Sequence, residues 1–537
     1  MTTPAAAAEP FDRCDVLIAG GGLAGLTLAL HLRQQTPKLS VVVLERRPLP
    51  CPISAHKVGE STVEIGAHYF AEVLGLREHL QKEHLRKFGF RFFFSEGLRN
   101  FDRVVELGAS HYLSVPTYQI DRGLFENHLA ERVRAAGITL IDDARVAAIE
   151  LNPSAATDAS AEHQVDWLRD GQRQRTRCRW VIDACGRASL LKRKLQLAQP
   201  NGHEAHAVWF RMDHRIAVDR WSDDPAWRAR CTVPDRWLST NHLCGEGYWV
   251  WLIPLSSGSH SVGIVADPAV HPLQTMDTFD KAMDWIERYQ PRLYDELDPH
   301  RDTLQDFAFF RQFSYGCRRT FSDQRWALAG EAGRFLDPFY SPGSDFIAIG
   351  NTYIAGLIAR DARGEPIRAA ARAFDVLYRT FYENMLPLYE RQYPLFGNAA
   401  AMSAKVLWDY TYYWSVLAPL FFHQRIDDLE LLSDAAPDLA TCSQLNETVQ
   451  AHFRRISPAA GPTESTVMFD QCRLDWFVEL NRRLTEPQDA EALRRGLAEA
   501  ARLMEKLSRE ILEPSDAPPE LLLTRAATSH RDFVAAS

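Results

Sequence analysis

A strand–turn–helix–strand unit over residues 15–45 constrains the fold more than any other feature of the 537-residue chain. An apolar run leads into the turn Gly20-Gly21-Gly22-Leu23-Ala24-Gly25, an apolar helix follows, and a second apolar run ends in Glu45. Gly20 permits the tight bend, Gly22 lets the backbone approach a pyrophosphate, and Gly25 lets the helix pack against the strand. The N–H groups at the helix start can bind phosphate, and Glu45 stands where an acid accepts a ribose hydroxyl. The unit predicts a dinucleotide site with contacts from Gly20, Gly22, Leu23, Ala24, Gly25, Glu45 and Arg46.

Composition narrows the class of protein. The net charge is -9 without a long run of one sign, which argues against a nucleic-acid partner. The 9 cysteines form no C-x-x-C pair, so we expect neither a disulfide framework nor a metal site, and we expect a cytoplasmic location. No run of 18 apolar residues occurs, so no transmembrane segment is expected. Residues 1–12 are small and polar, and we expect them to be disordered and to contain no signal peptide.

Two local patterns predict the elements between the nucleotide unit and the next motifs. Residues 63–86 predict a helix, and phenylalanine at every second position over residues 88–94 predicts a strand. The C-terminal region, residues 366–537, is predicted to be helical. We expect residues 429–466, which are rich in Asp, Pro and Ser, to interrupt it as a mobile linker.

The segments expected at the nucleotide lie far apart in the chain, which predicts a discontinuous module within residues 13–365. The parts of that module are about 13–80, 115–200 and 320–365. The strand-rich aromatic segments between them, about 81–114 and 201–319, predict an inserted antiparallel sheet that forms the substrate domain. The expected fold class is therefore α/β, with a Rossmann-type module, an inserted sheet and a helical C-terminal region.

Three further segments resemble the flavoprotein monooxygenases of the p-hydroxybenzoate hydroxylase fold. Residues 121–126 (DRGLFE) are similar to their D-R-x-x-F/L motif, residues 183–187 (DACGR) to their D-A-x-G turn, and residues 330–338 (GEAGRFLDP) to their G-D-A-A segment, with Glu331 in place of aspartate. The resemblance implies FAD. A plain NAD-binding fold is the alternative, but NAD enzymes lack the late segment. The further implied FAD contacts are Gly59, Glu60, Ser61, Arg122, Asp183, Gly186, Gly330, Glu331, Pro338, Gly343 and Ser344.

Within that superfamily, residues 247–254 (GYWVWLIP) resemble the W-x-W-x-I-P signature of the flavin-dependent halogenases. In a strand, Trp249, Trp251 and Ile253 share one face. The resemblance implies that the two indoles form a wall beside the flavin, which a halide passes and an aromatic substrate does not. A tryptophan-rich core strand is the alternative interpretation of the same residues.

A lysine is the second residue that points to halogenation. In the halogenases, G-E-A/S precedes a K-x-G/A-x-x-F strand by about thirty residues. Here Gly59-Glu60-Ser61 precedes Lys87, which begins the aromatic strand. The resemblance implies that Lys87 holds hypohalous acid as an ammonium or reacts with it as a free amine. Desolvation among the phenylalanines would favour the free amine. The alternative is an ordinary solvated lysine.

The segment 337–345 (DPFYSPGSD) resembles the halide and flavin turn of the family. The implied halide contacts are Ser341, Pro342 and Gly343, because backbone N–H groups in a turn can bind an anion. Tyr340 stands where tryptophan-specific halogenases carry glutamate, and Pro342 stands where they carry threonine and lacks an N–H group. We therefore expect a native substrate other than tryptophan.

The resemblance implies two-component chemistry. A separate NAD(P)H-dependent flavin reductase supplies FADH2, and a flavin hydroperoxide oxidises bromide or chloride to hypohalous acid. Lys87 then directs the halogen onto an indole, phenol or pyrrole-like ring, free or tethered to an acyl carrier protein. The alternatives are an aromatic-ring hydroxylase, a catalytically silent FAD-binding protein, and a flavin-dependent lipid reductase of the same fold.

Overall fold

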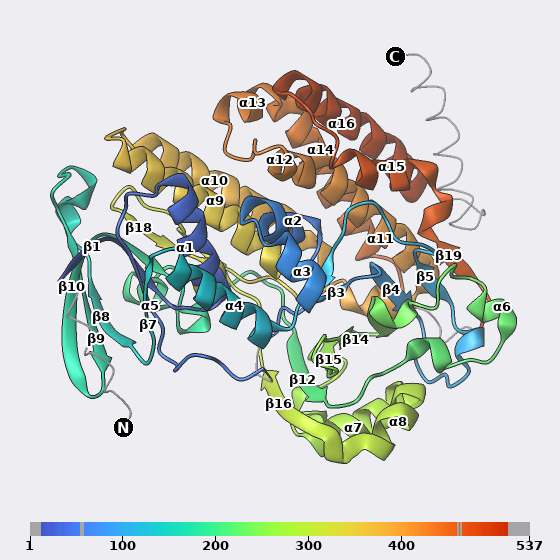
Figure 1. Cartoon of the computed structure of the whole chain (residues 1–537). Coiled ribbons are helices and arrows are strands. Elements are labelled where there is room, and N and C mark those ends of the chain that lie inside the picture. The colour runs from blue at the N-terminus through green and yellow to red at the C-terminus, as the bar shows by residue number, and fades with distance from the viewer. Residues whose placement is uncertain (1–11, 54–57, 459–460, 462–463, 514–537) are drawn as a thin grey trace.

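The computed structural model describes residues 12–53, 58–458, 461 and 464–513. The expected disorder of residues 1–12 therefore concerns a segment almost wholly outside the described residues. Two large sheets organise the chain (Figure 1). In Figure 1, the first sheet lies at the left, and the C-terminal helices lie above the second sheet at the right. No helix of the described residues is long and apolar enough to cross a membrane.

The first sheet has seven strands, and its parallel centre begins with the nucleotide unit. Strand β1 pairs in parallel with β2 on one side and with β10 on the other, and the carboxyl end of β10 pairs with β18. The strands are, in sheet order, β7 (Thr139–Ile141), β2 (Val41–Leu44), β1 (Arg13–Ala19), β10 (Gln172–Asp183), β9 (His163–Arg169) and β8 (Arg145–Glu150), with β18 (Trp326–Leu328) beside β10. The run of Val, Leu and Ile in β1 and β2 is buried on both faces, as parallel strands require.

Helix α1 (Leu23–Gln35) packs against two other helices beside this sheet, and these contacts position the later motifs. This helix contacts both α4 (Arg122–Ala135) and α9 (Gly343–Ala362). Asp121 caps α4, because its side chain accepts a hydrogen bond from the Gly123 N–H group. The segments around residues 20, 122 and 343 are thereby brought to one region of the molecule.

The second sheet has eight strands and is antiparallel except at two pairs, β13–β4 and β5–β19. Its strands are, in order, β16 (Leu304–Phe310), β12 (His206–Met212), β15 (His260–Ala266), β14 (Tyr248–Pro254), β13 (Thr240–Gly245), β4 (Phe90–Phe93), β5 (Glu106–Gly108) and β19 (Met468–Asp470). Strand β19 lies within the C-terminal region that the sequence predicts to be helical, and the sequence pattern does not indicate this strand.

Both faces of the second sheet are covered. Residues Trp249, Trp251 and Ile253 of β14 face the main core, whereas Val250 and Leu252 belong to a separate core. That separate core lies against α7 (Phe279–Tyr289) and α8 (Pro291–Leu297), which Figure 1 shows below the sheet. The period-two alternation of strand side chains therefore places the two indoles on one face.

The segment 63–86 is broken rather than continuously helical. It consists of α2 (Glu64–His68), a π-helical turn (Tyr69–Val73) and α3 (Arg77–Glu83), followed by β3 (Leu85–Arg86), which pairs with β6 (Tyr118–Gln119). Gly75 lies between the helices at φ +68, a left-handed conformation that ends a helix and that glycine adopts without strain. The break directs the following residues into the second sheet.

The expectation that residues 429–466 form a mobile linker is wrong for residues 429–453, which are helical. Residues 429–453 form α13 and α14, and α14 packs against α16. Asp428 caps α13 and Pro437 lies in the first turn of α14, so the Asp and Pro residues mark helix starts. The C-terminal helices are α10 (Arg368–Met385), α11 (Ala399–Tyr412), α12 (Ala418–Phe422), α13 (Leu429–Asp434), α14 (Ala436–Phe453), α15 (Asp475–Arg483) and α16 (Ala490–Leu512).

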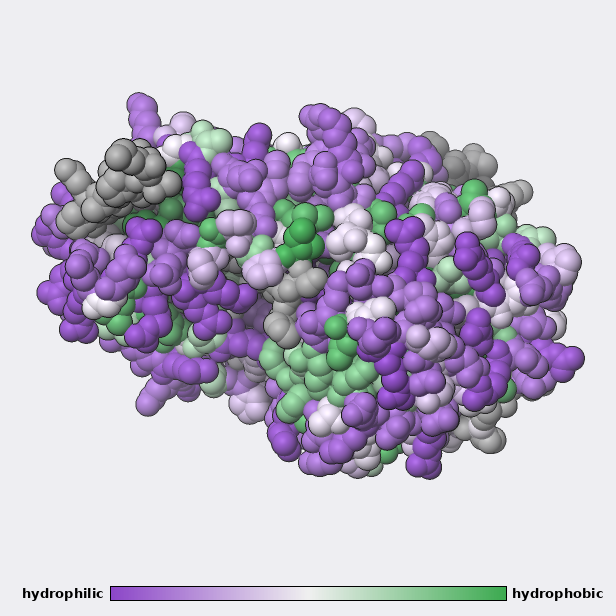
Figure 2. Space-filling view, turned by 60° about the horizontal axis from the view of Figure 1, so that its bottom comes forward, coloured by the Kyte–Doolittle hydropathy of each residue, from purple (hydrophilic) through white to green (hydrophobic). Residues whose placement is uncertain are grey.

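The face of the molecule drawn in Figure 2 carries mostly hydrophilic side chains, interrupted by apolar areas of which the broadest lies just below its centre. Acidic and basic residues are nearly balanced in number, 70 against 61.

Candidate active site

A cavity of about 520 Å³ is lined by residues from both sheets. It brings together motifs that lie up to about three hundred residues apart in the chain. The predicted site residues that line it are Gly20, Gly22, Leu23, Ala24, Glu45, Arg46, Gly59, Glu60, Ser61, Arg122, Gly186, Trp249, Trp251, Gly330, Glu331, Pro338, Ser341, Pro342, Gly343 and Ser344. Three predicted residues do not line it, namely Gly25, Asp183 and Lys87.

The three glycines of the first motif have separable roles. Gly20 lies at φ +113, and a Cβ atom there would stand 2.3 Å from the Ala184 carbonyl oxygen. A Cβ atom on Gly25 would stand 2.0 Å from the Gly20 carbonyl oxygen. A Cβ atom on Gly22 would meet nothing within 4 Å. Gly20 and Gly25 are therefore needed by the fold, whereas Gly22 leaves open space at the start of α1, where a pyrophosphate fits.

Two acids at this end of the first sheet bind backbone groups. The Glu45 carboxylate accepts hydrogen bonds from the N–H groups of Gly21, at 2.7 Å, and Arg47, at 3.0 Å. Asp183 lies beneath the turn and accepts from the N–H groups of Cys185 and Leu191. Glu45 remains on the cavity wall, but Asp183 shapes the turn from behind.

Charged groups around the cavity fit a dinucleotide. Arg122 donates to the Val58 carbonyl oxygen and to Glu126, which holds its guanidinium at the wall. Arg187 Nε lies 3.2 Å from Glu331 Oε2. The extra methylene of glutamate at position 331 therefore reaches an arginine of the 183–187 turn. The arginines, the open space above Gly22 and the acid at position 45 together suit the pyrophosphate and ribose of FAD.

The two indoles of β14 form one buried side of the cavity. Their ring centroids are 5.7 Å apart. Trp249 Nε1 donates to the Tyr393 hydroxyl at 3.3 Å, and Trp251 Nε1 donates to Ser261 Oγ at 3.1 Å. A Cβ atom on Gly263 would stand 2.1 Å from the Trp251 ring, so this glycine makes room for the indole. Hydrogen bonds and close packing therefore fix the orientation of both rings.

The turn before α9 has a strained backbone. Tyr340 and Ser341 both have left-handed φ values, +66 and +52. Such strain persists only where the surroundings impose it, and here the Tyr340 hydroxyl donates to Asp409 Oδ2 at 2.8 Å. Pro342 has no N–H group, so the first N–H groups of α9, on Gly343 and Ser344, are the donors available at the cavity wall.

Lys87 lies behind the cavity wall. Its ammonium donates to Ser61 Oγ at 3.0 Å and to the Thr62 carbonyl oxygen at 2.9 Å, and it lies 3.4 Å from the centroid of the Phe90 ring. Ser61 Oγ is also 2.9 Å from Thr240 Oγ1, and both hydroxyl-bearing residues line the cavity. A pair of hydroxyl groups therefore separates the cavity from the lysine.

Burial dominates the electrostatics of this lysine. Only 3% of Lys87 is exposed, and desolvation lowers its pKa to about 7, while the nearby carboxylates of Glu64 and Asp345 oppose the shift. Burial also raises the pKa of Asp345 to about 8. At neutral pH, Lys87 therefore exchanges readily between the ammonium and the free amine.

This pKa predicts a pH-dependent stability. Between about pH 7 and the usual lysine value of 10.5, the unfolded chain binds a proton at Lys87 that the folded chain does not, so stability rises with pH. From pH 7.5 to 9.5, we expect the free energy of unfolding of the wild type to rise by about 2–3 kcal/mol more than that of Lys87→Met. Urea unfolding of both proteins at the two pH values measures the difference. Equal pH dependence would contradict the lowered pKa.

Sequence reasoning missed Glu64 and the groups that surround it. Glu64 is buried among side chains from α9, α11, the π-helical turn Tyr413–Leu417 that follows α11, and α15. The one available signal was an acid standing alone between Val63 and Ile65 in an otherwise apolar stretch. Its neighbours come from residues 345, 413 and 481, which no local pattern connects.

Comparisons with known proteins place these features in context. A family model described as FAD binding domain matches residues 13–243. The flavin-dependent halogenase chlA of Dictyostelium discoideum is 27% identical over 437 residues, which cover 76% of this chain and 70% of the relative. The 1H-pyrrole-2-carbonyl-(peptidyl-carrier protein) chlorinase of Pseudomonas fluorescens is 26% identical over 392 residues, which cover 69% of this chain and 80% of the relative.

Solved structures show the same fold. The halogenase PltM superimposes with a TM-score of 0.63 at 17% identity, covering 92% of this chain and 96% of that one. The flavin-dependent brominase Bmp2 superimposes with a TM-score of 0.56 at 21% identity, covering 71% of this chain and 87% of that one.

Proposed function

Because the chain carries an FAD binding domain and is similar to flavin-dependent halogenases over about 70% of its length, we propose that it is such a halogenase and that it brominates or chlorinates an electron-rich aromatic carbon at Lys87. The observation that carries the proposal is the buried lysine, which stands one hydrogen bond behind the wall of the cavity. When bound as FADH2, the cofactor supplies, with O2, the oxidising power that turns halide into hypohalous acid.

The proposed reaction takes place in two parts of the site, the cavity and the surroundings of Lys87 behind its wall. Trp249 and Trp251 close one side of the cavity with bulky, fixed rings, which keeps an aromatic substrate out. The hydroxyl groups of Ser61 and Thr240 offer a polar path for small hydrogen-bonding molecules towards the lysine ammonium. A molecule the size of hypohalous acid passes where an aromatic ring does not.

The halide has a suitable place at the cavity wall. The N–H groups of Gly343 and Ser344 begin α9, and the positive end of a helix dipole favours an anion. Ser341 lines the same turn in a left-handed conformation. The proposed halide site is therefore at residues 341–344 on the cavity wall.

An indole, phenol or pyrrole-like ring is the proposed substrate, free or tethered to a carrier protein. A relative named as a peptidyl-carrier-protein pyrrole chlorinase and another named as a brominase support the carrier-bound form. The Phe90 ring lies against the Lys87 ammonium, and the Tyr410 ring lies beside Phe90, so aromatic side chains suited to a flat ring stand near the lysine. A separate NAD(P)H-dependent reductase supplies the reduced flavin.

A halide-dependence experiment tests the proposal. Purified protein is supplied with FAD, a flavin reductase and NADH, and it is offered indole, simple phenols and a pyrrole with bromide, chloride or no halide. We expect halogenated product only with halide, detected by mass spectrometry. A hydroxylated product that is independent of halide would overturn the proposal and assign the protein to the aromatic hydroxylases.

A further inference from the structure

A buried carboxyl group, that of Glu64, interacts electrostatically with Lys87 and is poorly satisfied by hydrogen bonds. Glu64 is 6% exposed, and its Oε1 accepts a long hydrogen bond, 3.4 Å, from Asn481. Among the described residues, Glu64 Oε2 and Trp414 Nε1 lack a hydrogen bond of good geometry, and the two side chains contact each other only weakly. A buried acceptor and a buried donor that are so poorly satisfied are costly, and they indicate a place where a ligand can improve the contacts.

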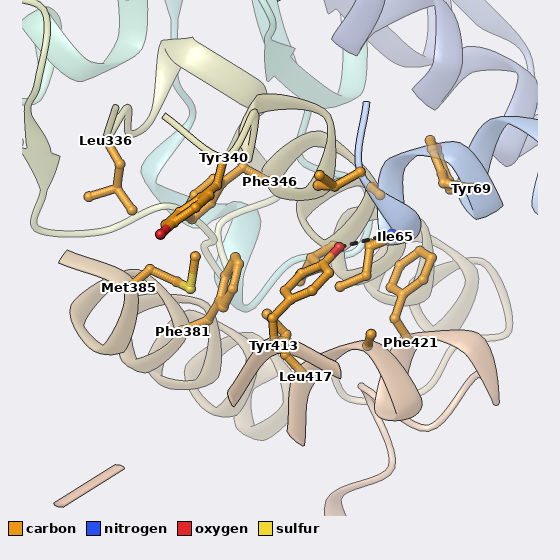
Figure 3. Packing of buried hydrophobic residues seen from close by; sticks show 14 of the residues in the cluster. Ile65, Tyr69, Leu336, Tyr340, Phe346, Phe381, Met385, Tyr413, Leu417 and Phe421 are labelled. Carbon is orange, nitrogen blue, oxygen red and sulfur yellow. Dashed lines mark hydrogen bonds between the residues drawn. The ribbon is translucent and has the colours of Figure 1, made fainter. Parts of the chain in front are cut away.

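Hydrogen bonds to the two residues after Glu64, Ile65 and Gly66, fix the backbone that carries the glutamate. The Tyr413 hydroxyl accepts a hydrogen bond from the Ile65 N–H group at 3.0 Å, which Figure 3 shows as a dashed line. Asp345 Oδ1 accepts from the Gly66 N–H group at 2.8 Å. Two residues before Glu64, the Thr62 carbonyl oxygen accepts from Lys87. The glutamate carboxyl is therefore positioned next to the lysine by backbone contacts that do not use its own oxygens.

Other titratable groups near Glu64 are committed elsewhere or are poor bases. Asp345 has both oxygens bonded, to Gly66 N–H and to the Tyr413 hydroxyl, and burial raises its pKa to about 8. Burial keeps the hydroxyl groups of Tyr410 and Tyr413 protonated by raising their pKa. His242 is fully buried next to Lys87, and its pKa falls to about 3, so it binds a proton weakly.

We propose that Glu64 is a second catalytic residue, the base that removes the ring proton during halogenation, an inference that rests on the proposed function. The aromatic carbon forms a bond to the halogen as the halogen–oxygen bond of hypohalous acid breaks. The hydroxide that leaves takes a proton from the Lys87 ammonium and becomes water. Glu64 Oε2 takes the proton from the ring carbon, and the C–H electrons restore the aromatic ring. Glu64 then returns its proton to Lys87, so the net reaction converts ring and hypohalous acid into halogenated ring and water.

The electrostatics support this division of roles. Burial raises the pKa of Glu64, and the positive charge of Lys87 opposes that shift. Among the charged groups that raise the pKa of Lys87, Glu64 acts most strongly and Asp345 second. The ammonium and the carboxylate therefore stabilise each other's charged forms in a buried site.

An isotope experiment with Glu64→Gln tests the assignment. The amide keeps the shape and the Asn481 contact but cannot accept the proton. The substrate is the phenol or indole that the wild type halogenates fastest, together with its ring-deuterated form. We expect the variant to lose about 10²-fold in rate and to show a primary isotope effect that the wild type lacks, because proton removal becomes rate-limiting. Flavin oxidation and the release of hypohalous acid, trapped separately, should stay unchanged.

Two variants serve as controls. Glu78→Gln removes an exposed carboxylate of α3 and should match the wild type in rate and isotope effect. Asp345→Asn should show no isotope effect, whatever its rate, because its oxygens are structural. Normal product formation in Glu64→Gln, or a loss of product without an isotope effect, would overturn the role of Glu64. Wild-type protein that forms no hypohalous acid and no product would instead show that the proposed function fails, and the role of Glu64 with it.

Discussion

Lys87→Ala is expected to abolish halogenated product while the oxidation of reduced flavin continues. The lysine ammonium is the group that stands behind the Ser61 and Thr240 hydroxyls, and no other described lysine occupies that position. Removing a positioned proton-transfer group typically costs about 10²–10⁴-fold in rate, and we expect a loss in that range. Product measured by mass spectrometry, with flavin oxidation followed by absorbance, separates the two activities.

Controls distinguish the loss of chemistry from the loss of the fold. Lys82→Ala removes a lysine that is exposed and paired with Glu78 on α3, and it should leave product formation unchanged. Lys87→Met fills more of the buried space than alanine and should be as inactive as Lys87→Ala. Product formation by either Lys87 variant at the wild-type rate would remove the lysine from the mechanism.

Gly22→Ala and Gly25→Ala are expected to fail in different ways. A methyl group at position 22 meets no protein atom, so the variant should fold normally but bind FAD about tenfold or more weakly, because the methyl group occupies space that the pyrophosphate needs. A methyl group at position 25 collides with the Gly20 carbonyl oxygen at 2.0 Å. That variant should be destabilised by about 1–3 kcal/mol or more.

Thermal unfolding without FAD and a fluorescence titration with FAD separate the two effects. Gly22→Ala should keep the wild-type melting temperature in the absence of FAD, whereas Gly25→Ala should melt at a lower temperature. If Gly22→Ala bound FAD as tightly as the wild type, the cofactor would not lie over the start of α1.

The parts of this molecule that could be predicted are those whose cause is local in sequence. The first motif carries its strand, turn, helix and acid within about thirty residues, so its glycines could be assigned separate roles before the fold was known. The alternation in residues 248–254 likewise placed Trp249 and Trp251 on one face, because strand side chains alternate whatever the tertiary context.

The surroundings of Lys87 could not be predicted, because they depend on packing between distant segments. The aromatic strand that follows Lys87 marked this lysine as unusual. Glu64 and Asp345 come near Lys87, and Tyr413 bonds to Asp345, only because α2, α9 and the helical C-terminal region pack together. The segment 63–86 also showed helical character, but the left-handed Gly75 divides it. Local propensity does not predict which apolar faces of distant segments pack against each other in the folded chain.

The short strand β19 bears on how this protein could be redesigned. Residues Met468–Asp470 pair with Glu106–Gly108, and Asp470 Oδ1 also accepts a hydrogen bond from the Ser110 N–H group. A chimera that exchanges the last third of the chain for that of another enzyme would lose β19. The edge of β5 would then have no strand partner, and its N–H and C=O groups would be exposed. Grafts intended to alter substrate choice should therefore either retain this strand or supply an equivalent one, and cross over within the helices on either side of it.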